Sequence, residues 1–178
     1  MKKGSVVFSV LILFIVTASL AWAKHSRIIE ERNEYGGKTE EITYSKGDDN
    51  YDEGISKIVE YYDGTLRIKR IASYYLDEHA NKDGVYKREQ YYHNEPFEEA
   101  RLKKAEFYYT DAHAEKDGIR EVEVEYDGDG KKKKAEYYYT DAYARKKVLA
   151  KMEVFYNSRG EGYKRVYLDK DGKIISQE

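Results

Sequence analysis

An internal repeat constrains this chain more than any other feature of its sequence. The pattern Tyr-Tyr-x-Asp-x-(His/Tyr)-Ala-x-Lys occurs three times without gaps, over residues 74–82, 108–116 and 138–146. A second tyrosine series falls between the copies, with separations of 30, 34 and 30 residues between Tyr62, Tyr92, Tyr126 and Tyr156. Self-similarity at a period of roughly 20 to 50 residues is typical of proteins built from like units that stack on one another.

The content of the units favours β-strands. In the segment 119–126, valine or tyrosine alternates with glutamate, which is the period of two that a pleated strand imposes. Asp-Gly pairs, which readily supply the positive φ of hairpin turns, stand at 63–64, 83–84, 117–118, 127–128 and 171–172. We therefore predict an all-β fold, an elongated antiparallel meander of β-hairpin repeats with about 10–11 strands.

Several of these segments are too polar to enclose a thick core. Residues 87–90 and 131–136 carry charged side chains on both prospective faces. The middle unit is longer by four residues, which fall in the segment 93–100 with the only proline of the chain. An insertion that leaves the flanking spacing intact is typical of a loop. The sequence thus favours an open, twisted sheet, whose edge strands could pair with another chain or with a second copy.

The N-terminus has the organisation of a secretory signal peptide. Lys2 and Lys3 precede an uncharged apolar run that ends in Ala21-Trp22-Ala23, and small residues three apart suit signal-peptidase cleavage. We predict that residues 1–23 are removed and that residues 24–178 form a single domain in the periplasm or outside the cell. The alternative is an uncleaved membrane anchor, because the run approaches the roughly 20 residues that span a bilayer.

Composition excludes several classes of partner and anchor. Without Lys2 and Lys3, the 32 basic residues fall to 30 against 34 acidic residues, a net charge of −4. A chain with this net negative charge has no overall positive potential to attract phosphate groups, so we expect no nucleic-acid partner. The chain has no cysteine, which rules out disulfides and a cysteine-linked lipid anchor. All 20 tyrosines follow residue 23, and tyrosine suits half-solvated surfaces.

No catalytic, cofactor or metal motif stands out. The chain lacks a Gly-x-Ser-x-Gly segment and a complete phosphate-binding glycine loop. His79 and His113 occupy equivalent repeat positions, which in a flat sheet lie roughly 10 Å apart, too far to share one ion. The segments 127–130 and 169–172 resemble calcium loops only faintly and are interpreted as turns, because the ligands expected further along are absent. We therefore expect no cofactor, no metal and no enzyme activity.

We predict that the repeated segments 77–82, 111–116 and 141–146 are loops, and the candidate binding residues are those that the repeat retains there and in the preceding tyrosines. Many different sequences can form a turn. The presence of an imidazole or phenol ring at the same position in all three copies therefore favours a shared role at the surface. Recent duplication would leave the copies equally alike. The candidates are Tyr75, Tyr109, Tyr139, Asp77, Asp111, Asp141, His79, His113 and Tyr143.

The cadence of Tyr-Tyr and Asp-Gly over residues 35–172 resembles MORN-type repeats and the Tyr-rich wall-binding repeats of secreted bacterial proteins. MORN units are shorter and carry glycines within their strands, whereas the segment 119–126 contains none. The resemblance implies a binding or scaffold role.

Three functional hypotheses follow from these observations. The first is a non-enzymatic exported protein that binds a protein or an envelope component through its Tyr-rich sheet and stacked loops. The second is a glycan-binding module in which tyrosine rings stack on sugars. The third is an enzyme whose site is assembled from residues far apart in the sequence.

The predicted cleavage can be tested directly. N-terminal sequencing of the exported protein should begin at Lys24, because peptidase recognition follows the small residues at 21 and 23. Exported material that begins at Met1 would instead support the uncleaved anchor.

Overall fold

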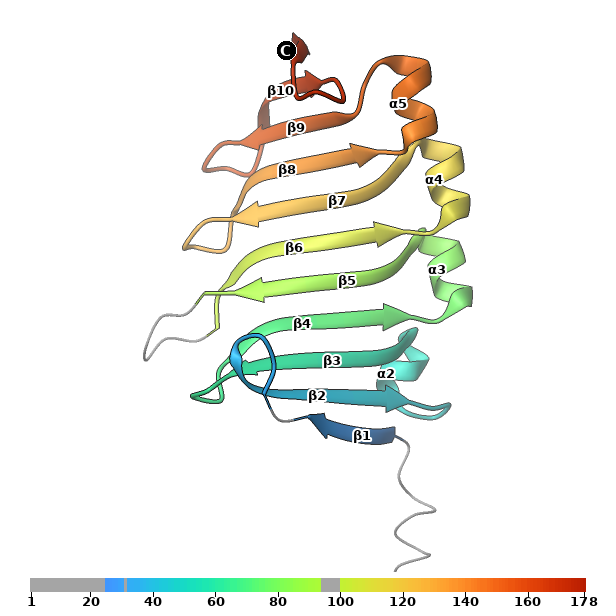
Figure 1. The fold of residues 1–178 in the computed structure, drawn as a ribbon, viewed down its shortest axis with the longest axis vertical. Coiled ribbons are helices and arrows are strands. Elements are labelled where there is room, and N and C mark those ends of the chain that lie inside the picture. The colour runs from blue at the N-terminus through green and yellow to red at the C-terminus, as the bar shows by residue number, and fades with distance from the viewer. Residues whose placement is uncertain (1–24, 31, 94–99) are drawn as a thin grey trace, which may run out of the picture.

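One antiparallel sheet of eleven strands in chain order forms the body of the protein (Figure 1). The structure is a computed structural model that describes residues 25–30, 32–93 and 100–178. It confirms the predicted all-β meander of hairpins. The strands are β1 (His25–Glu30), β2 (Gly36–Tyr44), β3 (Ile55–Asp63), β4 (Ile68–Tyr75), β5 (Val85–Tyr92), β6 (Leu102–Tyr109), β7 (Ile119–Tyr126), β8 (Lys132–Tyr139), β9 (Lys151–Tyr156), β10 (Gly162–Leu168) and β11 (Ile174–Gln177).

The predicted signal peptide and the inserted part of the longer connection lie outside the described residues. The frame around the insertion is intact, because the His93 amide donates to the Arg101 carbonyl at 3.0 Å. Among the described residues, no helix has the length and apolarity needed to cross a membrane.

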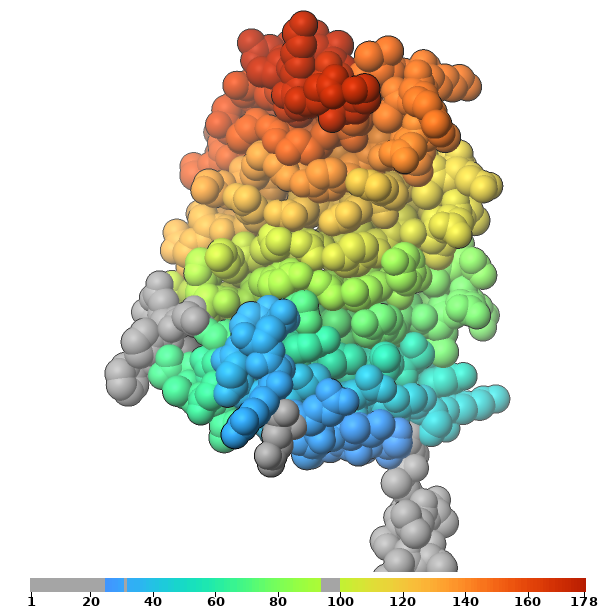
Figure 2. Space-filling model, viewed as in Figure 1, coloured from blue at the N-terminus to red at the C-terminus, as the bar shows by residue number. Residues whose placement is uncertain are grey.

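The sheet is a single layer, as the polarity of the strands predicts. Among the described residues, the extensive contacts of each strand are with its neighbours in the sheet and with the short helices at one end of the strands. No large side chain in the described part of the chain is fully buried. Figure 2 shows the strands as successive bands of side chains across one broad face. Apolar side chains must therefore cover one another sideways on the same face.

The repeated segment forms short helices, and the prediction that it is a loop was wrong. The helices are α2 (Asp49–Asp52), α3 (Asp77–Asp83), α4 (Asp111–Asp117) and α5 (Asp141–Lys147), and they stand in a row along one side of the sheet (Figure 1). The Thr110 hydroxyl caps α4 by accepting from the His113 amide at 3.3 Å. Gly84 and Gly118 end α3 and α4 in the left-handed conformation, as C-terminal glycines commonly do. These two Asp-Gly pairs therefore terminate helices rather than make hairpin turns.

At the opposite end of the strands, the pairs β1–β2, β3–β4, β7–β8 and β9–β10 are joined by five-residue turns. In each turn the side-chain oxygen of an Asp or Asn accepts from the backbone N–H groups two and four residues further on; at Asp127 these distances are 3.0 and 2.9 Å. The positive φ falls on the fourth residue, Gly130, rather than on Gly128. The location of the turn at 127–128 was predicted, but the residue that needs positive φ was not. The turn between β10 and β11 uses the same geometry from Asp169, so both segments that resemble calcium loops form turns.

Successive units are joined by a repeated contact between helices. The backbone N–H of Leu76, Thr110 and Thr140 donates to the carbonyl of Gly54, Gly84 and Gly118 in the unit before, at 2.8, 2.7 and 2.8 Å. The third residue of α3, α4 and α5 places its ring on the same glycine. A Cβ atom at Gly118 would lie 2.2 Å from Cδ2 of Tyr143, so only glycine fits there.

Replacing Gly118 tests this contact between units. Gly118→Ala adds a methyl group against the Tyr143 ring at a positive φ, and should lower the free energy of unfolding by about 2–4 kcal/mol. Gly130→Ala is the matched control, because its φ is +75° and a Cβ there meets nothing within 4 Å. It should cost only about 1–2 kcal/mol, the backbone contribution alone. Urea unfolding of both variants measures the difference, and equal losses would contradict the ring contact.

Candidate functional site

The two faces of the sheet differ in chemistry because successive residues of each strand point to opposite sides. One face carries a row of glutamates that stand directly opposite one another on five neighbouring strands, β5 to β9. The row consists of Glu89, Glu106, Glu123, Glu136 and Glu153. We call this side the glutamate face. Like charges directly opposite one another destabilise a sheet, so this row requires compensation.

Lysines two residues before four of these five glutamates supply the counter-charge. Lys87 lies 2.7 Å from Glu89, and Lys104 lies 2.6 Å from Glu106 and 3.5 Å from Glu123. Lys151 bridges two strands, 2.7 Å from Glu153 and 3.1 Å from Glu136. Lys134 pairs with the same two carboxylates. A network of half-buried pairs is more stabilising than isolated surface pairs.

Tyrosine hydroxyls complete the glutamate face. The Tyr91 hydroxyl donates to Glu89 at 2.7 Å and to Glu106 at 3.0 Å. The Tyr108 hydroxyl donates to Glu106 at 2.7 Å. The Lys104 ammonium also lies 4.7 Å from the centre of the Tyr91 ring, within range of a cation–π contact. Burial, followed by the hydrogen bond to Glu89, raises the pKa of Tyr91.

Strand β7 breaks this pattern. Glu121 stands opposite Tyr108 and Tyr138, at the position where β5 and β9 carry Lys87 and Lys151. One carboxylate oxygen each of Glu106, Glu121 and Glu123 lies within 4.8 Å of the others. Burial and the charge of Glu106 raise the pKa of Glu121. We assign no ion to this cluster, because the Lys104 ammonium already lies between Glu106 and Glu123. Sequence reasoning missed the cluster, since it depends on which residues of different strands are paired.

The other side of the sheet, which we call the aromatic face, gathers apolar side chains over β6 to β9. Its centre is the buried group of Val122, Val124 and Ala135. Partly buried side chains surround this centre: Phe107, Tyr109, Ile119, Tyr126, Tyr137 and Tyr156. Burial, followed by the charge and hydrogen bond of Tyr156, raises the pKa of Tyr137 to about 12.

An open hollow of about 420 Å³ extends the aromatic face toward β10. Its lining combines aliphatic, phenolic and guanidinium groups: Ile119, Tyr137, Met152, Val154, Tyr156, Gly162, Arg165 and Tyr167. Among the described residues, no further layer covers the aromatic face. This surface can therefore receive a partner that is apolar at its centre and polar at its rim.

The structure places the candidate binding residues along the row of helices. Tyr75, Tyr109 and Tyr139 end β4, β6 and β8, on the side of the sheet that carries the aromatic face. Asp77, Asp111 and Asp141 are the exposed first residues of α3, α4 and α5. A negative charge is favourable at that helix position.

The rings of His79, His113 and Tyr143 are half-buried against the preceding unit. Each ring lies against the glycine of the preceding unit. His113 also stacks on Tyr109, with ring centres 4.6 Å apart, and Tyr143 stacks on Tyr139 at 4.9 Å. The imidazole of His113 therefore covers the ring of Tyr109.

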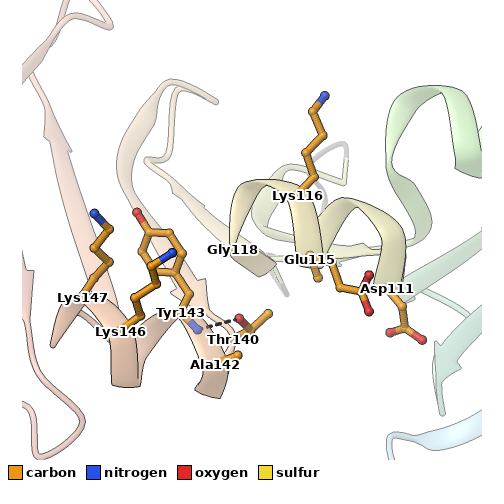
Figure 3. A pocket seen from close by; sticks show the side chains of 10 residues that line it. Asp111, Glu115, Lys116, Gly118, Thr140, Ala142, Tyr143, Lys146 and Lys147 are labelled. Atoms are coloured by element: carbon orange, nitrogen blue, oxygen red, sulfur yellow. Dashed lines mark hydrogen bonds between the residues drawn. The ribbon is translucent and has the colours of Figure 1, made fainter.

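A second open hollow, of about 520 Å³, lies between α4 and α5 (Figure 3). Lysines dominate its outer part: Lys116, Lys146 and Lys147. Thr140 and Tyr143 form its floor, where the Tyr143 amide donates to the Thr140 hydroxyl at 3.2 Å. The repeated helices thus bring Asp111 of one unit and the lysines of the next to one groove.

No protein-family model matches this chain, and no curated protein is significantly similar to it.

The glutamate face predicts an unusual dependence of stability on pH. Burial opposes ionisation of Glu136, but hydrogen bonds from Lys134, Tyr138 and Lys151 outweigh it and lower its pKa to about 2. Ionised Glu136 therefore contributes to the free energy of unfolding at pH values above the pKa of glutamate in the unfolded chain, ~4.3, and this contribution is lost as the pH falls toward 2. The raised pKa of Glu121 acts in the opposite direction, so stability should first rise as the pH falls from 7 toward 5.

Urea unfolding between pH 7 and 3 measures both effects. Glu121→Gln should be more stable than the wild type at pH 7 and should lack the rise between pH 7 and 5. Glu125→Gln, on the same strand and face, is the control and should retain that rise. An unchanged profile in Glu121→Gln would contradict the assignment.

Proposed function

We propose that this protein is a non-enzymatic, exported repeat scaffold that binds a protein or cell-envelope partner through its aromatic face. The observation that carries the proposal is the contrast between the two faces. The charges of the glutamate face are largely matched by lysines and tyrosines of the same face. On the aromatic face, partly buried tyrosines surround the buried centre and an open hollow lies beside it.

Tyrosine is well suited to such a binding surface. It contributes a large ring with few rotatable bonds and a hydroxyl that can bond to the partner, and it is enriched among the residues that dominate binding energy. Tyr137 and Tyr156 are both held in place by packing against the buried centre of this face. A surface that is ordered before binding loses less entropy on association.

Export follows from the N-terminal sequence. The charged start, the apolar run and Ala21-Trp22-Ala23 support delivery to the periplasm or the outside of the cell. A sheet without disulfides is compatible with that compartment, because its stability rests on strand pairing and on lateral packing alone.

Paired variants on the two faces test the binding surface. Tyr137→Ser combined with Tyr156→Ser removes two rings from the aromatic face and should weaken capture of partners from an envelope extract at least about tenfold, as expected for central interface tyrosines. Tyr108→Ser combined with Tyr138→Ser removes two rings from the glutamate face and should retain capture. Circular dichroism establishes that both variants are folded. Equal capture by the two variants would contradict the proposal.

A second candidate function is glycan binding, which one observation favours. Equivalent tyrosines such as Tyr109 and Tyr139 recur every second strand, a spacing of roughly 10 Å, which is close to the disaccharide repeat of extended β-linked polysaccharides. The hollow also places Arg165 beside tyrosine hydroxyls. Co-sedimentation with purified envelope polysaccharide, lost in the Tyr137/Tyr156 variant, would favour glycan; capture of protein only would favour the first candidate.

A further inference from the structure

The first strand of the sheet offers an open edge. Among the described residues, β1 pairs only with β2, and all six of its residues are exposed. An unpaired strand edge presents a row of backbone donors and acceptors that can pair with another chain.

The chain after β1 leaves this edge accessible. The turn that follows β1 folds back over the sheet in front of β3 and β4 (Figure 1). It is held there by an ion pair between Glu34 and Arg70 at 3.1 Å and by an edge contact of Tyr35 with Tyr61.

The edge at β1 is better suited to strand pairing than the edge at β11. The register of β1 with β2 is unbroken over the six residues His25–Glu30. The register of β11 with β10 shifts at Tyr167/Leu168, and such irregularities are among the devices by which proteins protect sheet edges. The straight strand is therefore the stronger template.

Apolar side chains are exposed on both sides of this edge. Ile28 is 57% exposed and Ile29 is 53% exposed. The two neighbours point to opposite faces of the sheet, because side chains alternate along a strand. A strand added to this edge would cover one isoleucine on each face.

We propose that two copies of this chain associate through β1, with the two strands antiparallel and Ile28 opposite Ile28 of the second copy. A two-fold symmetric antiparallel pair always places one residue opposite itself. A pair centred on Arg27 or Glu30 would oppose like charges, which is unfavourable. Ile28 and Ile29 lie between these two residues, and a pair centred on either isoleucine opposes no like charges at its centre.

A pair centred on Ile28 includes more residues of β1 than a pair centred on Ile29. It pairs the five residues 26–30 with their counterparts, so that Ser26 faces Glu30 and Arg27 faces Ile29. A centre at Ile29 would pair only residues 28–30 within β1. The first arrangement gives more backbone hydrogen bonds and places a serine hydroxyl within reach of a carboxylate.

The symmetry has a structural consequence. A two-fold axis perpendicular to the sheet keeps like faces on the same side. The two sheets become one continuous sheet, with both aromatic faces directed the same way.

The absence of cysteine from the chain gives a direct test. In protein purified from cells that express the full chain, Ile28→Cys should form a disulfide-linked dimer rapidly in air. Opposed residues of an antiparallel pair have Cα atoms roughly 4.5–5.5 Å apart, within the range that a disulfide spans. Ile174→Cys is the matched control, since Ile174 is 56% exposed on β11, and should cross-link much more slowly.

Two further measurements keep the proposal open to refutation. Ile29→Cys should cross-link slowly, because the copies of Ile29 are offset by two residues; faster linkage than at Ile28 would overturn the register. By sedimentation equilibrium the unmodified protein should be a dimer, and Ile28→Lys should weaken it at least about tenfold without loss of β structure. A monomer at every concentration, or equal cross-linking at Ile28 and Ile174, would overturn the dimer.

Discussion

Sideways burial on a single-layer sheet is the constraint on which the rest of this structure depends. Without a second layer, a side chain can lose solvent contact only by being covered by neighbours on its own face. Ala72, Ala105 and Ala135 are 0–2% exposed because larger side chains on adjacent strands close over them. Tyrosines and long lysines can do this, since each combines an apolar body with a polar end that remains in water. The high tyrosine content therefore follows from the architecture.

The row of helices solves a second problem of an open array, which is to hold consecutive hairpins in register. Each of α3, α4 and α5 sets one backbone hydrogen bond and one ring against the glycine that ends the previous unit. Val148 occupies the corresponding position after α5, with φ at 58° and the side chain 64% exposed. No further helix follows α5 in the described chain. The last unit can therefore carry a valine where Gly84 and Gly118 must accept a ring.

Strand number and order could be predicted from the sequence, because period-two alternation and evenly spaced tyrosines are local signals. The helices could not, because Asp-Gly after a short polar segment is compatible with a hairpin turn and with a helix C-terminus. A threonine cap at Thr110 or Thr140, with alanines behind it, was the signal available for the helix. The glutamate row was also missed. The spacing Lys-x-Glu-x-Tyr recurs at 87–91, 104–108 and 134–138, but only the pairing register shows that these glutamates stand opposite one another.

The two faces of the same strands show how a sheet can carry many polar groups without loss of stability, because those groups bond to one another within the chain. On β8, Tyr137 points to the aromatic face and Tyr138 to the glutamate face, where its hydroxyl donates to Glu136 at 2.5 Å. A partner that approached the glutamate face would have to displace such internal bonds, and each carboxylate left without its donor would cost free energy. At the centre of the aromatic face a partner displaces water from apolar surface, which is favourable, and the internal bonds of this face lie at the edge of the hollow, where Arg165 and Tyr167 bond to Glu178. The energetic difference between the faces thus arises from which groups are already paired within the chain.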